Sequence, residues 1–415
     1  PQPEVTVLAM LTFQIAFRNI LRQKRRSILT GLSMTGGYVL FVFGFSLLEG
    51  SYGNIIDIFT LDSTGHIQIH QDDYRDRPKI YKTIQNQEQI KVALTDNPEI
   101  KSFTPRVFSP ALAYAGEKTA PSRIIGIDPV LEPTVSRLVQ KVAKGTYFST
   151  SPNPDGYYEA MIGRGLHIRL KLDVGDELVL ISSGADGSIA NDIFVVSAII
   201  GNKTSFDRMA VYLPLVAAQE FLSLGDDVHE YALLVNDKDA NETIASGLSA
   251  QLPELTVAPW QEVEATFYRT MQADKQGNYF SMGLITFIVF IGVLNTVLMS
   301  VLERTREFGV LRAIGSRPMQ LVRLISLETF ILAFISVMVG FLLILPFVYW
   351  FAEVGMLMPE PIDMGGIEFQ HMKGEMSARV FWMPMAFILG TAVLISIPPG
   401  FRAARILPKE AMGSH

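Results

Sequence analysis

Residues 280–300 read FSMGLITFIVFIGVLNTVLMS, a run of 21 residues without one charged side chain. A helix needs about 20 apolar residues to cross the hydrocarbon core of a membrane, so this stretch predicts a transmembrane helix over 280–302. A soluble helix of this length would show a polar stripe, and this one shows none. The same argument predicts transmembrane helices at 27–48, 324–351 and 380–400, where the one charged residue is Glu328.

Basic residues cluster beside particular ends of these predicted helices. They are Arg18, Arg22, Lys24, Arg25 and Arg26 before the first helix, Arg304, Arg306, Arg312, Arg317 and Arg323 between the second and third, and Arg402, Arg405 and Lys409 after the fourth. Loops rich in lysine and arginine stay in the cytoplasm. We therefore expect three cytoplasmic parts: an amphipathic N-terminal segment at 1–26, a helix and loop at 303–323, and a tail at 401–412. The segments 49–279 and 352–379, the second of them mostly acidic, are expected outside.

The composition agrees with a membrane location. Charged residues make up 18% of the chain, against about 25% in a soluble domain. The chain contains no cysteine, which excludes disulfides and zinc–thiolate sites. The net charge of −6 gives no reason to expect a nucleic-acid partner. The last residues, 413–415, are typical of a tag remnant.

The segment 49–279 predicts a folded α+β domain. Alternating polar and apolar residues predict strands at 65–70 and 177–181, and helical spacing is found at 87–94 and 240–252. We expect a strand-rich insertion at 157–227. The few helix breakers before Tyr279 predict that the second membrane helix continues outward.

The stretch 303–315 reads ERTREFGVLRAIG and predicts a short amphipathic helix. Phe308, Leu311 and Ile314 recur at helical spacing, and Gly315 with Pro318 predicts its end. Such a helix can dock into a groove on a soluble partner or lie at the membrane interface. Amphipathicity alone favours the interfacial alternative.

Four stretches together resemble the FtsX/MacB-type ABC permease superfamily. They are 303–315 itself, 16–27 (AFRNILRQKRRS), 162–176 (IGRGLHIRLKLDVGD) and 399–411 (PGFRAARILPKEA). Within this superfamily, the predicted strand at 65–70 and the residues 126–129 (GIDP) resemble the lipoprotein-releasing (LolC/LolE-type) permeases most. The order and spacing of these motifs extend the resemblance over nearly the whole chain.

The resemblance implies a porter-like periplasmic domain and a permease that works as a homo- or heterodimer in the bacterial inner membrane, in contact with membrane lipids. It also implies two ABC ATPase subunits, which bind ATP and Mg²⁺. The 415 residues contain no phosphate-binding Gly-x-x-x-x-Gly-Lys-Ser/Thr motif, so we expect no cofactor and no enzymatic activity on this chain. The residues implied to couple ATPase motion to the membrane are Glu303, Arg304, Arg306, Glu307, Phe308, Gly309 and Leu311.

Several functions stay open under this resemblance. Release of lipoprotein or another lipidic cargo is one, MacB-like export of peptides or small molecules is another, and FtsX-like regulation of a periplasmic enzyme, with no transported cargo, is the third. Permeases that recruit a periplasmic lipoprotein carrier use a proline-containing hook between two strands. The corresponding stretch, 182–192, is short and lacks proline.

Two polar features raise other hypotheses. His66 and His70 would lie on one side of a strand, which suggests either a metal site or, the favoured interpretation, the polar face of an amphipathic strand. Glu328 suggests a proton relay or, again favoured, an interfacial acid that pairs or reaches water, with Arg323 nearby. We expect no metal site and no catalytic site.

Overall fold

The computed structural model describes residues 14–22, 24–364 and 367–405. The chain forms two compact units. The helical unit comprises the described residues up to Gly53, Gln272–Met356 and those from His371 onward. The sheet unit comprises Asn54–Met271 and Leu357–Gln370.

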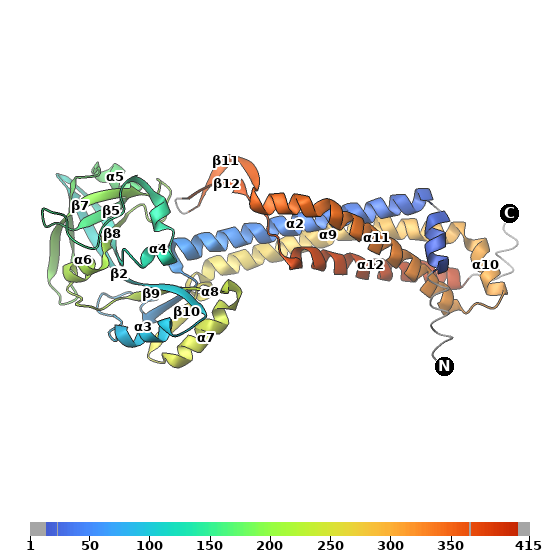
Figure 1. The fold of residues 1–415 in the computed structure, drawn as a ribbon, viewed down its shortest axis with the longest axis horizontal. Helices are drawn as coiled ribbons and strands as arrows, with labels where there is room; N and C mark the ends of the chain where they lie inside the picture. The colour runs from blue at the N-terminus through green and yellow to red at the C-terminus, as the bar shows by residue number, and fades with distance from the viewer. Residues whose placement is uncertain (1–13, 23, 365–366, 406–415) are drawn as a thin grey trace. The chain divides into compact units, whose positions relative to one another are not determined.

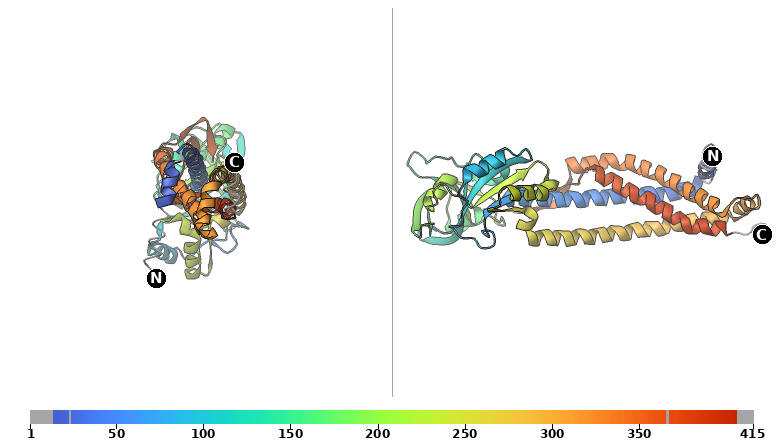
Figure 2. Two further views of the ribbon diagram at one scale, coloured as in Figure 1. Left: turned by 90° about the vertical axis from the view of Figure 1, so that its right-hand side faces the viewer. Right: turned by 90° about the horizontal axis from the view of Figure 1, so that it is seen from below.

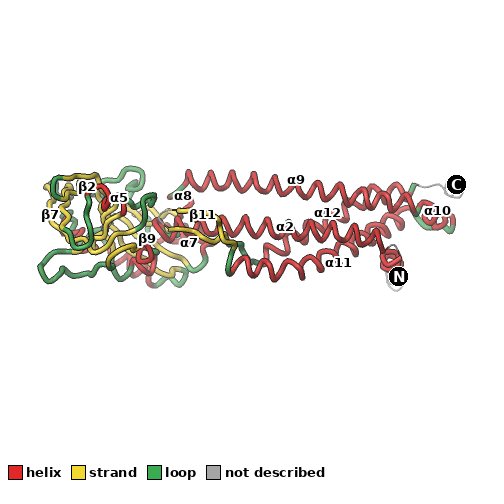
Figure 3. The backbone as a smooth tube through the Cα atoms, turned by 90° about the horizontal axis from the view of Figure 1, so that it is seen from above, coloured by secondary structure: helices red, strands yellow, loops and turns green. Residues whose placement is uncertain are grey.

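Four helices in the described part of the chain are long and apolar enough to cross a membrane, which confirms the four predicted from the sequence. They are α2 (Lys24–Phe59), α9 (Ala265–Glu303), α11 (Pro318–Glu353) and α12 (Ala378–Ala404). They run alongside one another in Figures 1, 2 and 3. At 1.5 Å per residue they are about 40 to 58 Å long, so each exceeds a hydrocarbon core of about 30 Å. The predicted continuation of the second membrane helix before residue 280 is confirmed, since α9 begins at Ala265.

A short helix, α10 (Thr305–Ala313), follows α9, and residues 14–22 are also helical. One buried cluster draws side chains from all five numbered helices of this unit. Its members include Met34, Val297, Phe308, Ile325 and Ile395. The helices therefore pack into one bundle, with α10 as part of it.

The sheet unit is built on a ten-stranded sheet within residues 67–259. Its strands are β1 (Ile67–Gln71), β2 (Ile100–Ala115), β3 (Lys118–Ile127), β4 (Val142–Gly145), β5 (Glu159–Gly163), β6 (Glu177–Ser183), β7 (Ile189–Ile200), β8 (Ala210–Pro214), β9 (Glu230–Val235) and β10 (Leu255–Pro259). The strand order is β10-β1-β9-β2-β3-β8-β5-β7-β4, and β6 pairs with β2 and β7. The strands of the expected insertion at 157–227, β5 to β8, thus belong to the same sheet as the rest.

Helices and short helical turns connect these strands. They are a π-helical turn at Thr60–Thr64, α3 (Gln87–Thr95), α4 (Glu132–Val135), a 3-10 turn at Leu138–Lys141, α5 (Arg164–Leu170), α6 (Leu215–Phe221), a 3-10 turn at Lys238–Ala240, α7 (Asn241–Gln251) and α8 (Trp260–Val263). The predicted helical spacing at 87–94 and 240–252 is confirmed by α3 and α7.

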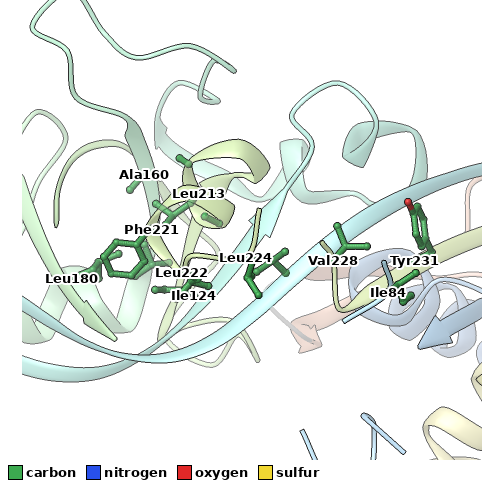
Figure 4. Close-up of a cluster of buried hydrophobic side chains, with 14 of the residues drawn as sticks. Ile84, Ile124, Ala160, Leu180, Leu213, Phe221, Leu222, Leu224, Val228 and Tyr231 are labelled. Atoms are coloured by element: carbon green, nitrogen blue, oxygen red, sulfur yellow. The ribbon is translucent and has the colours of Figure 1, made fainter. Parts of the chain in front are cut away.

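Apolar side chains from the strands and helices form the core of the sheet unit. Ile124, Leu180 and Leu213 come from three strands and Phe221 from α6, and all are buried together (Figure 4). Burial of such side chains contributes about 1.5–3 kcal/mol each. Successive side chains of a strand point to opposite sides of a sheet, so every second residue of a strand points into this core.

The segment 352–379 differs from the loop expected there. It contains two paired strands, β11 (Met356–Met364) and β12 (Ile367–Met372). Its acidic composition and two prolines near residue 360 gave no alternating pattern from which strands could be predicted.

Candidate functional site

The charged turn between α9 and α11 is the candidate site of the helical unit. The start of α2, the end of α9, α10, the start of α11 and the end of α12 gather at one end of this unit (Figures 1 and 3). Contacts within the buried cluster agree, since Phe308 of α10 packs with Ala403 of α12 and Leu321 of α11. The segments with the predicted coupling residues and most of the predicted basic anchors therefore lie close together.

Arg304 lies where α9 ends and α10 begins, and only 7% of it is exposed. Its Nε donates a hydrogen bond of 2.8 Å to Oε2 of Glu307. Its Nη1 donates to both carboxylate oxygens of Glu328, at 3.1 and 3.0 Å. The guanidinium also lies 5.1 Å from the ring centre of Phe308, a favourable cation–π position. One side chain thus joins α10 to α11.

The charges around Arg304 alternate in sign. Burial acts to lower the pKa of Arg304, but the charge of Glu328 and the hydrogen bonds that Arg304 donates to Glu307 and Glu328 outweigh it, and the pKa is raised. Arg22, from the helical residues 14–22, lies 3.6 Å from the other oxygen of Glu307. The network Arg22–Glu307–Arg304–Glu328 therefore connects three segments of the chain. The sequence indicated that Glu328 pairs or reaches water, but the structure pairs it with Arg304 rather than with Arg323.

The apolar side chains of α10 point in two directions. Phe308 is fully buried and Leu311 packs against the same core, whereas Ile314 is 79% exposed and Val310 is 44% exposed. The expected single ridge of Phe308, Leu311 and Ile314 is therefore wrong. Val310 was not among the apolar residues predicted for this helix, although its spacing of four from Ile314 places both on one face.

The helix α10 ends just before Gly315, where the sequence predicted its end. Gly315 has φ +99°, a conformation that only glycine adopts at little cost. Its amide donates to Arg312 O at 3.1 Å, and the amide of Ser316 donates to Leu311 O at 3.1 Å. Pro318 then begins α11, where its missing N–H is no disadvantage.

The remaining predicted residues lie around this turn. Glu303 and Arg306 are exposed, and Gly309 is buried beside Phe308. Arg18, Arg22, Lys24, Arg25, Arg402 and Arg405 are all exposed. Some of the predicted parts lie outside the described residues. They are residues 1–13 of the N-terminal segment, the side chain of Arg26, and the tail beyond Arg405 with residues 413–415.

The histidine pair lies in the sheet unit and is not solvent-facing. His66 and His70 are 8% and 3% exposed, and β1 is buried between β10 and β9. Nδ1 of His66 accepts from the amide of Val235 at 3.2 Å, and Nε2 of His70 lies 3.1 Å from Glu230. The described residues contain no group of three or more histidine, aspartate or glutamate ligands suited to a metal. The predicted strand is β1, and the two polar side chains on one side of it are buried and hydrogen-bonded within the sheet unit.

Two family models match the chain. The MacB-like periplasmic core domain matches residues 27–251, more than half of the 415 residues, and the FtsX-like permease C-terminal domain matches residues 279–408. The second match includes α10 and all of its predicted coupling residues.

Several curated proteins are similar over long stretches. The lipoprotein-releasing system transmembrane protein LolC of Xylella fastidiosa is 24% identical, with 94% of this chain and 96% of that protein covered. LolE of Haemophilus influenzae is 21% identical over 80% of this chain and 82% of that protein. The macrolide export ATP-binding/permease protein MacB of Nitrobacter winogradskyi is 25% identical over 65% of this chain but 41% of that protein. With its apolar helices and its matched periplasmic domain, the chain belongs to the FtsX-like and MacB-like ABC transporter permeases of the inner membrane, in the LolC/LolE and MacB group.

Proposed function

We propose that this chain is a permease subunit that releases lipoprotein, or another lipidic cargo, from the membrane. In this proposal ATP is hydrolysed with Mg²⁺ on two separate ATPase subunits, and α10 receives their motion in the cytoplasm. A second permease, either another copy or a paralogue, completes the assembly. The termini are cytoplasmic, and the sheet unit is periplasmic and does the work on the cargo.

The observation that carries the coupling role is the double attachment of Arg304. A displacement of α10 pulls on Glu328 of α11 through two hydrogen bonds, and Phe308 transmits it to the buried core. At the same time Val310 and Ile314 stay exposed next to Arg306. An exposed apolar pair with an adjacent charge is suited to a groove on a partner, so α10 has one face for docking and one for transmission.

The cargo proposal is supported by the extent of the similarity. The LolC relative aligns along nearly the full length of both chains, whereas the MacB relative is matched over less than half of its own length. The connection between β6 and β7 is short, and Gly184 donates to Ser188 O at 2.9 Å across it. This tight turn favours a subunit that leaves carrier docking to its partner.

The test is the double substitution Val310→Asp with Ile314→Asp. Two carboxylates on the docking face should weaken ATPase binding at least tenfold, since buried interface positions contribute about 2 kcal/mol or more. The measurements are co-purification of the ATPase that accompanies the wild-type permease, and ATP-dependent release of a lipoprotein from proteoliposomes.

The matched control is Val130→Asp, at a residue 70% exposed in the sheet unit. It adds the same kind of charge at an exposed valine and should leave ATPase binding unchanged. Normal ATPase binding by the double variant would refute the docking face. Intact ATPase coupling without lipoprotein release by the wild type would instead refute the cargo and leave the coupling role standing.

A further inference from the structure

The helix at residues 14–22 packs on the helical unit through one side. Ala16 and Ile20 are buried, and they pack with Leu324 and Ile331 of α11. These two residues of α11 lie in the first two turns of the third predicted membrane span. The helix runs across the direction of the long helices in Figures 1 and 2. It therefore has the level and the orientation of a helix that lies in the surface of a membrane.

The rest of the surface of this helix exposes apolar side chains. Ile15 is 42% exposed, Phe17 41% and Leu21 53%. Phe17 and Leu21 are four residues apart, so they share one face of the helix. Exposed apolar residues of an interfacial helix are buried at the boundary between lipid headgroups and acyl chains. A membrane surface therefore accounts for side chains that the helical unit itself leaves uncovered.

Two arginines lie beside the apolar pair. Arg18 and Arg22 follow Phe17 and Leu21 by one residue each, which is about 100° around a helix, and both are exposed. Arg18 has no ion-pair partner among the described residues. A guanidinium can bind a phosphate through two parallel charge-assisted hydrogen bonds. The helix thus combines an apolar flank with a flank suited to an anion.

The acids at this end of the helical unit do not cancel the positive charge. Residues 14–32 and 393–405 contain no acid, and residues 303–328 contain Glu303, Glu307 and Glu328. Glu328 accepts from Arg304 through both oxygens, and Glu307 accepts from the same guanidinium at 2.8 Å. The bases of the three stretches are Arg18, Arg22, Lys24, Arg25, Arg26, Arg304, Arg306, Arg312, Arg317, Arg323, Arg402 and Arg405. The charge left over at this end is therefore positive.

Arg22 is the point where this surface meets α10. Its Nη1 lies 3.6 Å from Oε1 of Glu307, with 79% of the Arg22 side chain and 47% of the Glu307 side chain exposed. An ion pair so exposed contributes little to stability, and Glu307 keeps its hydrogen bond from Arg304 without it. A phosphate can therefore replace Glu307 as the partner of Arg22, and the exchange removes an attachment between the helix at 14–22 and α10.

From this arrangement we infer that the helix at 14–22 binds the headgroup of an anionic phospholipid, and that this lipid competes with Glu307 for Arg22. Arg18 and Arg22 hold the phosphate, while Phe17 and Leu21 enter the acyl layer beneath it. A membrane richer in anionic lipid then loosens α10 from this helix. The binding needs no ATPase and no cargo, whereas its effect on coupling rests on the proposed role of α10.

The experiment is native mass spectrometry of the full chain in detergent, with phosphatidylglycerol or phosphatidylcholine of the same acyl chains added in steps. We expect phosphatidylglycerol to bind about tenfold or more tightly than phosphatidylcholine. Arg18→Gln with Arg22→Gln should weaken phosphatidylglycerol binding about tenfold or more, because each basic residue at an anionic surface contributes about fivefold. Glu307→Gln should instead strengthen that binding about twofold or more, since the competing carboxylate is removed.

The matched control is Arg169→Gln with Lys203→Gln, which removes two positive charges from exposed positions of the sheet unit, on α5 and between β7 and β8. It should bind phosphatidylglycerol as the wild type does. Equal phosphatidylglycerol affinity of the two double variants, or equal affinity of the wild type for the two lipids, would overturn the inference. An unchanged affinity in the Glu307→Gln variant would overturn the competition for Arg22.

Two further measurements separate a membrane surface from other partners. Displacement of phosphatidylglycerol by an equal concentration of glycerol 3-phosphate would show a site for free phosphates and overturn the lipid assignment. Loss of the co-purifying ATPase in the Arg18→Gln, Arg22→Gln variant, with unchanged phosphatidylglycerol affinity, would assign this face to the ATPase. Failure of the lipid titration leaves docking through Val310 and Ile314 standing, because the titration contains neither ATPase nor cargo.

Discussion

Arg304 combines burial with a full set of charged partners. A guanidinium presents donors in a fixed planar fork, and here two edges of that fork are engaged by Glu307 and Glu328. Removing one partner of a buried pair leaves the other charge without compensation, whereas replacing both with apolar residues is often neutral. The residue is thus a strong connection between α10 and α11 only while both acids are present.

Two variants test this connection. Glu328→Ala should lower the stability of the purified chain by about 1–3 kcal/mol, because it strands a buried Arg304. Arg304→Met with Glu328→Met should recover most of the loss, since the buried guanidinium is removed together with its partner on α11, and the half-exposed Glu307 keeps Arg22 at 3.6 Å. Thermal unfolding in detergent gives both values. The reference is Glu88→Gln, which breaks an exposed pair with Lys91 at 3.4 Å and should change stability by less than about 0.5 kcal/mol; equal effects of Glu328→Ala and Glu88→Gln would contradict the role of Arg304.

The sequence alone predicted α10 and its charges, but not the direction of its side chains. Phe308, Leu311 and Ile314 recur every three residues, and at 3.6 residues per turn this spacing turns Ile314 about 120° away from Phe308. The buried cluster covers the Phe308 side. The partner of Glu328 was equally hidden, because Arg304 lies 24 residues away along the chain. Local periodicity contains no information about which side of a short helix a neighbouring bundle covers.

The contact between α2 and α11 depends on a glycine. A Cβ at Gly340 would lie 2.8 Å from Cδ1 of Tyr38, and Thr35 Oγ1 donates to Ser336 O at 2.9 Å one turn away. Small residues let membrane helices approach closely, and the hydroxyl adds a hydrogen bond between them. This pair of helices therefore has a tightly fixed separation.

Substitution at this glycine tests the contact. Gly340→Leu should destabilise the bundle by about 1–3 kcal/mol, the usual cost of overpacking. Gly390→Leu on α12 is the control, since a Cβ there meets no atom within 4 Å. Unfolding temperatures in the same detergent compare the two, and a Gly340 variant as stable as the Gly390 variant would show that α2 and α11 are free to separate.

Helices and strands differ in how far the sequence determines them. The four membrane helices were predictable because soluble proteins rarely contain an apolar, charge-free run of about 20 residues. The strand order was not, because partners such as Ile67 and Pro259 are far apart in the chain and no local signal pairs them. β3 and β8 are also distant in the sequence, and they pair in parallel. Through this pairing the insertion expected at 157–227 is continuous with the main sheet.

At the scale of the whole molecule, the two units share two helices. The segment of α2 beyond Gly53 and the segment of α9 before Gln272 belong to the sheet unit, and the rest of both helices belongs to the helical unit. A displacement of either helix along its axis therefore involves residues of both units. The transmission proposed above requires that α10 lies on the cytoplasmic side of the membrane and the β6–β7 turn on the periplasmic side.

The absence of cysteine makes that requirement directly measurable. Single substitutions Ala313→Cys on α10 and Asp186→Cys in the β6–β7 turn place one thiol in each region, and both positions are exposed. If loops rich in arginine remain inside, a membrane-impermeant maleimide should label the Asp186 variant in intact spheroplasts and the Ala313 variant only after lysis. Labelling of the Ala313 variant before lysis would place α10 outside, where no cytoplasmic ATPase can reach it, and the coupling mechanism would fail whatever the cargo.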